Sequence, residues 1–139
     1  MSTEGVGLKI LLVDDSDDDR YFFITAFRKS GVSGQIIEKQ DGDEAIEFLG
    51  QITACAQTEW PNAVFLDLKM PRRNGFDVLQ WVRERPALSP LQIFVLSGSH
   101  EASDIQRARE LGVVHYIVKP IKAERIRELL SAQRLTDSH

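Results

Sequence analysis

Four of the five short apolar runs in this sequence are followed by residues that can take part in chemistry. The first run ends at Asp14-Asp15, the third at Asp67, the fourth at Ser97 and the fifth at Lys119. Clustered carboxylates supply the oxygen ligands that Mg²⁺ prefers, and a hydroxyl and an ammonium can donate to phosphoryl oxygens. Asp67 is the best candidate for a nucleophile, because carboxylates form aspartyl-phosphate intermediates. Together these residues predict Mg²⁺-assisted phosphoryl chemistry.

Each of these residues alone has an ordinary structural role. A single Asp after a strand commonly forms a turn, and a Lys-Pro pair commonly lies in a loop. Crowded carboxylates raise one another's pKa unless a cation neutralises them. The combination at several strand ends is therefore what favours a shared site with a bound cation.

The segments that must position this site alternate between strand and helix patterns. Branched apolar runs predict strands, and apolar residues at helical spacing predict the helices between them. The predicted strands are 8–13, 36–39, 63–66, 91–96 and 116–118, and the predicted helices are 17–30, 43–49, 75–85, 103–111 and 122–134. This order predicts an α/β fold with an open, doubly wound, five-stranded parallel sheet. In such sheets ligands bind beyond the carboxyl ends of the strands, where the polar residues above are expected.

Length and composition limit the class of protein. A chain of 139 residues suits one domain, expected at residues 8–134 with a disordered N-terminal tail at 1–7 and a C-terminal tail at 135–139. The net charge of -4 argues against direct nucleic-acid binding, and a single cysteine excludes an internal disulfide. No apolar run approaches the roughly 20 residues of a membrane span, and no secretory signal is visible. We therefore expect a cytoplasmic protein without membrane contact.

The motifs at these positions resemble the receiver domain of two-component response regulators. The matching stretches are ILLVDDS at 10–16, VFLDLKMP at 64–71, NGF at 74–76, VLSG at 95–98 and YIVKP at 116–120. They stand in the family's order and spacing. The resemblance implies a stand-alone, chemotaxis-regulator-like receiver with the (βα)5 flavodoxin-like fold and strand order 2-1-3-4-5. The acidic stretch after the first run is most similar to single-domain regulators found beside phytochrome-type histidine kinases.

The resemblance assigns phosphorylation and metal binding to particular residues. Asp67 matches the phosphoacceptor, which takes a phosphoryl group from a kinase phosphohistidine. Asp15 matches the direct Mg²⁺ ligand and Asp14 the ligand that acts mainly through water. Asp67 itself and the backbone carbonyl of Lys69 would complete the protein ligands of Mg²⁺. No organic cofactor is implied.

The resemblance also assigns the switch. Ser97 matches the hydroxyl that moves toward the phosphoryl group, and Tyr116 matches the aromatic ring that turns inward with it. Lys119 matches the lysine that pairs with Asp67 and then with the phosphoryl oxygens, and the Lys119-Pro120 bond is expected to be cis. Lys69 and Ser99 occupy the positions that tune hydrolysis, and neither orients water, so slow autodephosphorylation is expected.

Partners follow from the same resemblance. We expect a histidine kinase or a histidine phosphotransfer protein to dock at residues 17–30 and 120–123. The resemblance to phytochrome-associated regulators suggests a phytochrome-type kinase. Output to a downstream protein and homodimerisation are expected on the face of the fourth helix, fifth strand and fifth helix, which carries Arg107, Arg109, Tyr116, Lys122 and Arg125. In the first helix, Phe22 and Phe23 cannot both occupy the centre of the apolar stripe, which leaves one for a partner. Asp17, Asp18 and Asp19 are interpreted mainly as charge that favours a helix N-terminus.

Three other classes of protein fit the sequence less well. An aspartate-nucleophile phosphatase of the haloacid-dehalogenase type needs an acid two residues after the nucleophile, where Lys69 stands. A flavin-binding electron carrier needs a loop after the first strand that cradles phosphate, and the acids from Asp14 to Asp19 would repel one. A degenerate receiver would lack chemical positions that are all filled here. The preferred interpretation is a signalling phosphoacceptor, not an enzyme, with the phosphatase as its alternative.

Overall fold

Strands and helices alternate throughout the part of the chain that the structure, a computed structural model, describes: residues 7–70 and 73–137. The strands are β1 (Leu8–Val13), β2 (Gly34–Lys39), β3 (Ala63–Leu66), β4 (Ile93–Ser97) and β5 (His115–Val118). The helices are α1 (Asp17–Ser30), α2 (Gly42–Ile52), α3 (Gly75–Arg83), α4 (Ala102–Glu110) and α5 (Ala123–Asp137), with 3-10 turns η1 (Gln57–Glu59) and η2 (Pro86–Leu88).

The two chain ends were expected to be tails. Residues 1–6 of the expected N-terminal tail lie outside the described residues. At the other end α5 extends to Asp137, so residues 135–137 continue the helix where a tail was expected. Pro71 of the matched motif at 64–71 also lies outside the described residues.

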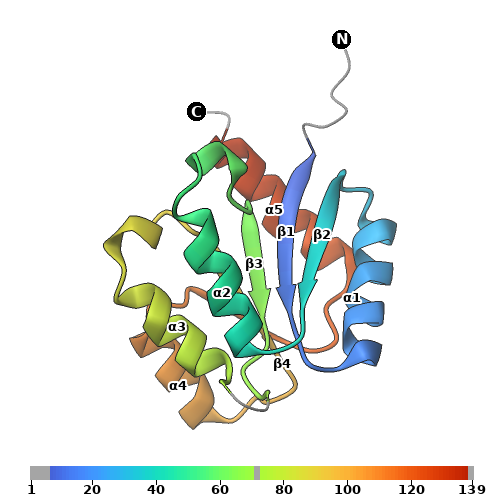
Figure 1. Ribbon diagram of the computed structural model, residues 1–139. Coiled ribbons are helices and arrows are strands. Elements are labelled where there is room, and N and C mark those ends of the chain that lie inside the picture. Colours follow the sequence, from blue (N-terminus) through green and yellow to red (C-terminus); the bar gives the residue numbers. More distant parts are fainter. Residues whose placement is uncertain (1–6, 71–72, 138–139) are drawn as a thin grey trace.

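The five strands form one parallel sheet in the order β2-β1-β3-β4-β5 (Figure 1). Helices α2, α3 and α4 cover one face, and α1 and α5 pack side by side on the other (Figure 1). The predicted doubly wound α/β fold and its strand order are thereby confirmed. Among the helices of the described residues, none has the length and hydropathy that a membrane span requires.

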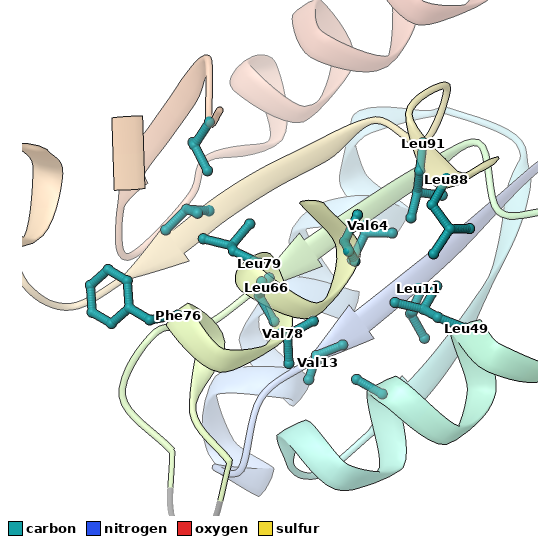
Figure 2. Packing of buried hydrophobic residues seen from close by; sticks show 14 of the residues in the cluster. Leu11, Val13, Leu49, Val64, Leu66, Phe76, Val78, Leu79, Leu88 and Leu91 are labelled. Carbon is teal, nitrogen blue, oxygen red and sulfur yellow. The ribbon is translucent and has the colours of Figure 1, made fainter. Parts of the chain in front are cut away.

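The face under α2, α3 and α4 is filled by aliphatic side chains. Leu11 and Val13 of β1 and Val64 and Leu66 of β3 alternate toward this face, as the two-residue period of a strand requires. Figure 2 shows them packed against Leu49, Val78, Leu79, Leu88 and Leu91. Burial of this apolar surface on both faces is the main contribution to folding.

The opposite face carries a row of aromatic rings. Phe23 of α1, Phe65 of β3, Phe94 of β4 and His115 of β5 follow one another with ring centroids 4.8, 5.0 and 5.3 Å apart. The neighbouring Phe22 is exposed. Helix α1 is thus anchored to the sheet by the first ring of a row that runs from α1 to β5.

Helix ends fix the loops that follow the strands. Ser16 caps α1 by accepting a hydrogen bond from the backbone N–H of Asp19, and α1 ends at Gly31, whose φ of 80° suits glycine. Asn74 and Asp77 form a capping box at the start of α3. Gly75 lies so close to β3 that a Cβ there would stand 2.3 Å from the Asp67 carbonyl oxygen. The N-terminus of α3 therefore packs directly against the end of β3.

Candidate functional site

The carboxyl edge of the sheet brings the polar residues at the strand ends together. Asp14 and Asp15 follow β1 and Asp67 follows β3, and their carboxylate oxygens lie within 4.8 Å of one another. Asp14 and Asp67 are buried, whereas Asp15 is exposed. A cluster with two buried members and one exposed member is accessible from solvent on one side only.

Backbone hydrogen bonds extend the sheet ladder into this edge. The N–H of Asp14 donates to the Lys39 carbonyl at 3.0 Å, and the N–H of Asp67 donates to the Val13 carbonyl at 2.9 Å. The buried Arg20 donates to the Asp14 carbonyl at 2.6 Å and to Glu38 at 3.0 Å. The backbone that carries the two buried carboxylates is therefore held by neighbours on several sides.

Lys119 lies among the carboxylates. Its Nζ is 2.7 Å from Oδ2 of Asp14, 2.7 Å from Oδ2 of Asp19 and 3.5 Å from Oδ2 of Asp67. Burial lowers its pKa, but the hydrogen bonds to Asp14 and Asp19 and the charge of Asp67 outweigh burial and raise the pKa above its usual value. Lys119 is therefore a fixed ammonium, and the bond to Pro120 is cis, as expected.

Asp19 is the member of this cluster that sequence reasoning missed. It was interpreted as helix-terminal charge, and its backbone does take part in the cap of α1. Its side chain, however, turns toward the sheet edge and contacts Lys119. The three acids of the first turn of α1 look alike in sequence, and only the direction of the helix decides which one faces the site.

The Asp67 carboxyl is the most perturbed acid of the site. Burial raises its pKa from 3.8 to about 6; the Lys119 charge opposes this, and the charge of Asp14 adds to it. Its Oδ1 lies 3.5 Å from the backbone N–H of Lys69, a long contact. A bound cation would oppose the burial and favour the ionised form.

The predicted switch residues meet at the loop between β4 and α4. The Ser97 hydroxyl is buried and accepts a hydrogen bond from the Ser99 N–H at 3.1 Å. The hydroxyl of the half-buried Tyr116 donates to the Ser99 carbonyl at 2.8 Å. Ser97 and Tyr116 are thus joined through Ser99, which sequence reasoning considered only for hydrolysis.

The Lys69 side chain pairs with Asp104. Its Nζ lies 3.3 Å from Oδ2 of Asp104, which also accepts a hydrogen bond from the Ser99 hydroxyl at 2.7 Å. The hydrogen bond from Ser99 outweighs burial and, with Lys69 and Arg107, holds the pKa of Asp104 below its usual value. Sequence reasoning gave Asp104 no part in the site.

The donor atoms at this edge fit a hard divalent cation. Asp14, Asp15 and Asp67 offer carboxylate oxygens only, at mutual distances that one ion can bridge. Mg²⁺ commonly takes one or two carboxylates, together with waters and phosphate oxygens, and the exposed side of the cluster leaves room for these. The chemistry of the donor set is therefore compatible with the predicted Mg²⁺ site.

Comparison with known proteins identifies a family whose pattern matches this chain. The pattern of the response regulator receiver domain matches residues 10–131. The chain is 33% identical over 110 residues to response regulator Rcp1 of Synechocystis sp., which covers 79% of this chain and 75% of Rcp1. Several other matching relatives are longer proteins, of which the chain spans 35% to 53%.

Solved structures agree with the sequence matches. The bacteriophytochrome response regulator AtBRR is similar with a TM-score of 0.76 and 30% identity, over 91% of this chain and 92% of that one. The Mn²⁺-bound form of Rcp1 is similar with a TM-score of 0.72 and 29% identity, over 94% and 92% of the two chains. The phosphorylated cyanobacterial phytochrome response regulator RcpA is similar with a TM-score of 0.74 and 29% identity, over 91% of this chain and 90% of that one.

Proposed function

The chain belongs to the response regulator receiver domain family of phosphorelay signalling, and on this premise we propose that Asp67 is its phosphoacceptor. One observation carries the proposal: Asp67 is a buried carboxylate that lies within 4.8 Å of two further acids and 3.5 Å from the Lys119 ammonium. The matches give no support to the phosphatase alternative.

The proposed reaction transfers the phosphoryl group from a phosphohistidine to Asp67. An oxygen of the ionised Asp67 carboxylate attacks phosphorus, the N–P bond breaks, and its electron pair returns to the imidazole of the donor. Lys119 stabilises the negative charge of the phosphoryl oxygens, and Ser97 supplies a hydroxyl donor at the same edge. Mg²⁺, when bound, neutralises charge on the phosphoryl oxygens. Asp14, Asp15, Asp67 and the Lys69 carbonyl would hold it; that this carbonyl is a ligand stays a prediction.

The proposed donor is a histidine kinase, and the surface of α1 supports docking there. Tyr21 and Phe22 are exposed, Phe22 to 59%. Phe22 borders a hollow of about 460 Å³ between α1 and the start of α5, whose lining carries the basic residues Lys29, Lys122 and Arg127 and one acid, Glu124. Apolar lining residues together with a net positive charge fit an acidic, amphipathic partner helix. The names of two similar structures, the bacteriophytochrome response regulator AtBRR and the phytochrome response regulator RcpA, support a phytochrome-type kinase.

The output and dimer face at α4, β5 and α5 stays a proposal. Val118, the last residue of β5, is exposed there, which suits a protein partner. The guanidinium of the exposed Arg107 stacks on the Phe76 ring of α3 at 4.1 Å, which holds this basic residue of the face beside α3. Cytoplasmic location, and signalling without turnover of another substrate, complete the proposal.

Intact-mass spectrometry after incubation with Mg²⁺ and acetyl phosphate tests the phosphoacceptor. We expect one added phosphoryl group on the natural protein and none on Asp67→Asn, because the amide is not a nucleophile. Asp18→Asn, which removes an exposed acid from the first turn of α1, is the control and should still be phosphorylated. Equal phosphorylation of Asp67→Asn would overturn the assignment, and a chelator should abolish the reaction.

A further inference from the structure

Asp104, in the first turn of α4, joins two loops that border Asp67. Its Oδ2 accepts a hydrogen bond from the Ser99 hydroxyl at 2.7 Å and lies 3.3 Å from Nζ of Lys69. Ser99 belongs to the loop after β4, and Lys69 to the loop after β3. The Asp104 side chain is 14% exposed and the Lys69 side chain 59%, so the hydrogen bond to the half-buried Ser99 is the better shielded of the two contacts.

Both loops continue from Asp104 into the phosphorylation site. On one side, the backbone N–H of Lys69 lies 3.5 Å from Asp67. On the other side, Ser99 donates its N–H to the Ser97 hydroxyl and accepts from the Tyr116 hydroxyl. Asp104 thus stands where contacts from the candidate phosphoacceptor and from both candidate switch residues meet.

A phosphoryl group on Asp67 would compete with Asp104 for these partners. It brings additional negative charge and three acceptor oxygens to a buried position two residues from Lys69. The Lys69 ammonium is then attracted toward Asp67 and away from Asp104, and the Ser97 hydroxyl gains an acceptor for its proton. Attraction of Lys69 weakens its ion pair with Asp104. A shift of Ser97 toward the phosphoryl group strains its contact with the Ser99 N–H, because Asp104 holds Ser99 in place through the Ser99 hydroxyl.

We propose that Asp104 is a positioning residue that stabilises the unphosphorylated arrangement of the two loops and so opposes phosphorylation of Asp67. The inference rests on the proposed function of Asp67 and deepens it by naming what the switch must break. The equilibrium between two loop arrangements is shifted by any group that contacts one arrangement better than the other. Removal of Asp104 therefore favours the phosphorylated arrangement.

The test is a titration with beryllofluoride, a stable mimic of the phosphoryl group, at fixed Mg²⁺ and followed by ¹⁹F NMR. Asp104→Ala loses both contacts and should bind beryllofluoride about 3- to 10-fold more tightly than the natural protein, the ratio expected for one hydrogen bond and one ion pair. Asp104→Asn retains an acceptor for Ser99 and loses the ion pair, so its affinity should lie between the two.

Glu110→Ala is the matched control. It removes the same charge from the same helix at the end away from the site, where Glu110 accepts a hydrogen bond from Gln106, and it should leave the affinity unchanged. Thermal unfolding separates positioning from general stability. Loss of an acid near a helix N-terminus should leave the melting temperature of Asp104→Ala unchanged or lower, while its affinity rises.

The outcomes distinguish the two proposals. Unchanged or weaker binding by Asp104→Ala, with normal binding by the natural protein, would overturn the positioning role alone. If the natural protein bound no beryllofluoride, the phosphoacceptor assignment would fall, and the role of Asp104 with it. Tighter binding in Asp104→Ala and in Glu110→Ala alike would also overturn the inference, because it would show an effect of net charge.

Discussion

At the scale of single residues, the Asp67 carboxyl is held between opposing influences. Burial and the charges of Asp14 and Asp15 favour its protonated form, and the Lys119 ammonium favours its ionised form. The net result is a pKa raised to about 6, so most of the carboxyl is ionised at neutral pH but at a cost to stability. A residue in this condition gains from any cation that binds beside it.

The raised pKa predicts how stability depends on pH in the absence of metal. Between pH 3.8 and about 6 the folded protein keeps a proton on Asp67 that the unfolded chain has released. The free energy of unfolding therefore falls as pH rises through this interval and stays lowered above it. Asp67→Asn lacks this group and should be more stable at pH 7.5 by about 1–3 kcal/mol.

Urea unfolding followed by circular dichroism, with a chelator present, measures this difference. The difference in the free energy of unfolding between Asp67→Asn and the natural protein should narrow toward pH 4.5, where Asp67 is protonated in the folded state. Mg²⁺ should stabilise the natural protein and reduce the gap at pH 7.5. A gap that did not change with pH would show that the substitution acts through packing and not through charge.

The site residues that directly follow predicted strands could be predicted from the sequence. Asp14, Asp67 and Lys119 follow apolar runs, so the topology alone brings them to one edge. Asp19 and Asp104 sit in helices, and their sequence signal is the same as that of any acid in a first helical turn. Only the packing of α1 and α4 against the sheet turns these two side chains toward the site.

At the scale of elements, α1 places one phenylalanine ring, Phe23, in the core and the adjacent one, Phe22, at the surface. Phe23 is 2% exposed and packs 4.8 Å from Phe65, whereas Phe22 is 59% exposed. Sequence periodicity placed both on one stripe and indicated that one must leave it. A rotation of about 100° per residue separates adjacent side chains, and the ring of Phe65 determines which of the two is buried.

Substitution of these two residues should separate folding from docking. Phe23→Ala should lower the free energy of unfolding by about 3–5 kcal/mol, because it leaves a cavity beside Phe65. Phe22→Ala should change stability by less than about 0.5 kcal/mol and should weaken transfer from a cognate kinase. Denaturant unfolding measures the first effect, and phosphotransfer kinetics at varied protein concentration measure the second. A rate unchanged in Phe22→Ala would place the kinase elsewhere.

Strand and helix positions were predicted better than their ends. The strand at 8–13 and the helix at 17–30 match the structure. The strand predicted at 91–96 is observed at 93–97, because Leu91 is held by a turn from Leu88 and packs into the core from outside the sheet. The helix predicted at 43–49 extends to Ile52, since burial of Ile52 continues the apolar face. Tertiary packing decides these ends, and it is not visible in local patterns.

At the scale of the whole molecule, the sheet separates charge from apolar packing. Two apolar layers lie on its faces, and several carboxylates with one ammonium lie at its carboxyl edge. The three acids of the proposed metal site carry more negative charge than Lys119 balances, so folding brings like charges together. The folded state should therefore be stabilised by any divalent cation that fits this edge.

Mg²⁺ should raise the melting temperature of the whole domain. At a free Mg²⁺ concentration about 100 times its Kd, the stabilisation of about 2.7 kcal/mol corresponds to a rise of roughly 8 °C. Asp15→Asn should lose most of this rise, whereas Asp18→Asn should keep it. Circular dichroism melts with and without a chelator measure the shift, and an equal rise in both variants would place the cation elsewhere.

The arrangement of the two apolar layers has an optical consequence. Both tryptophans of the sequence, Trp60 and Trp81, pack on the face under α2, α3 and α4. The face under α1 and α5 contains phenylalanine rings, which emit weakly. Intrinsic fluorescence excited at the red edge of tryptophan absorption therefore reports on one face only. Rearrangements in the α2–α4 layer will change the emission, and a partner that binds α1 will leave it nearly unchanged.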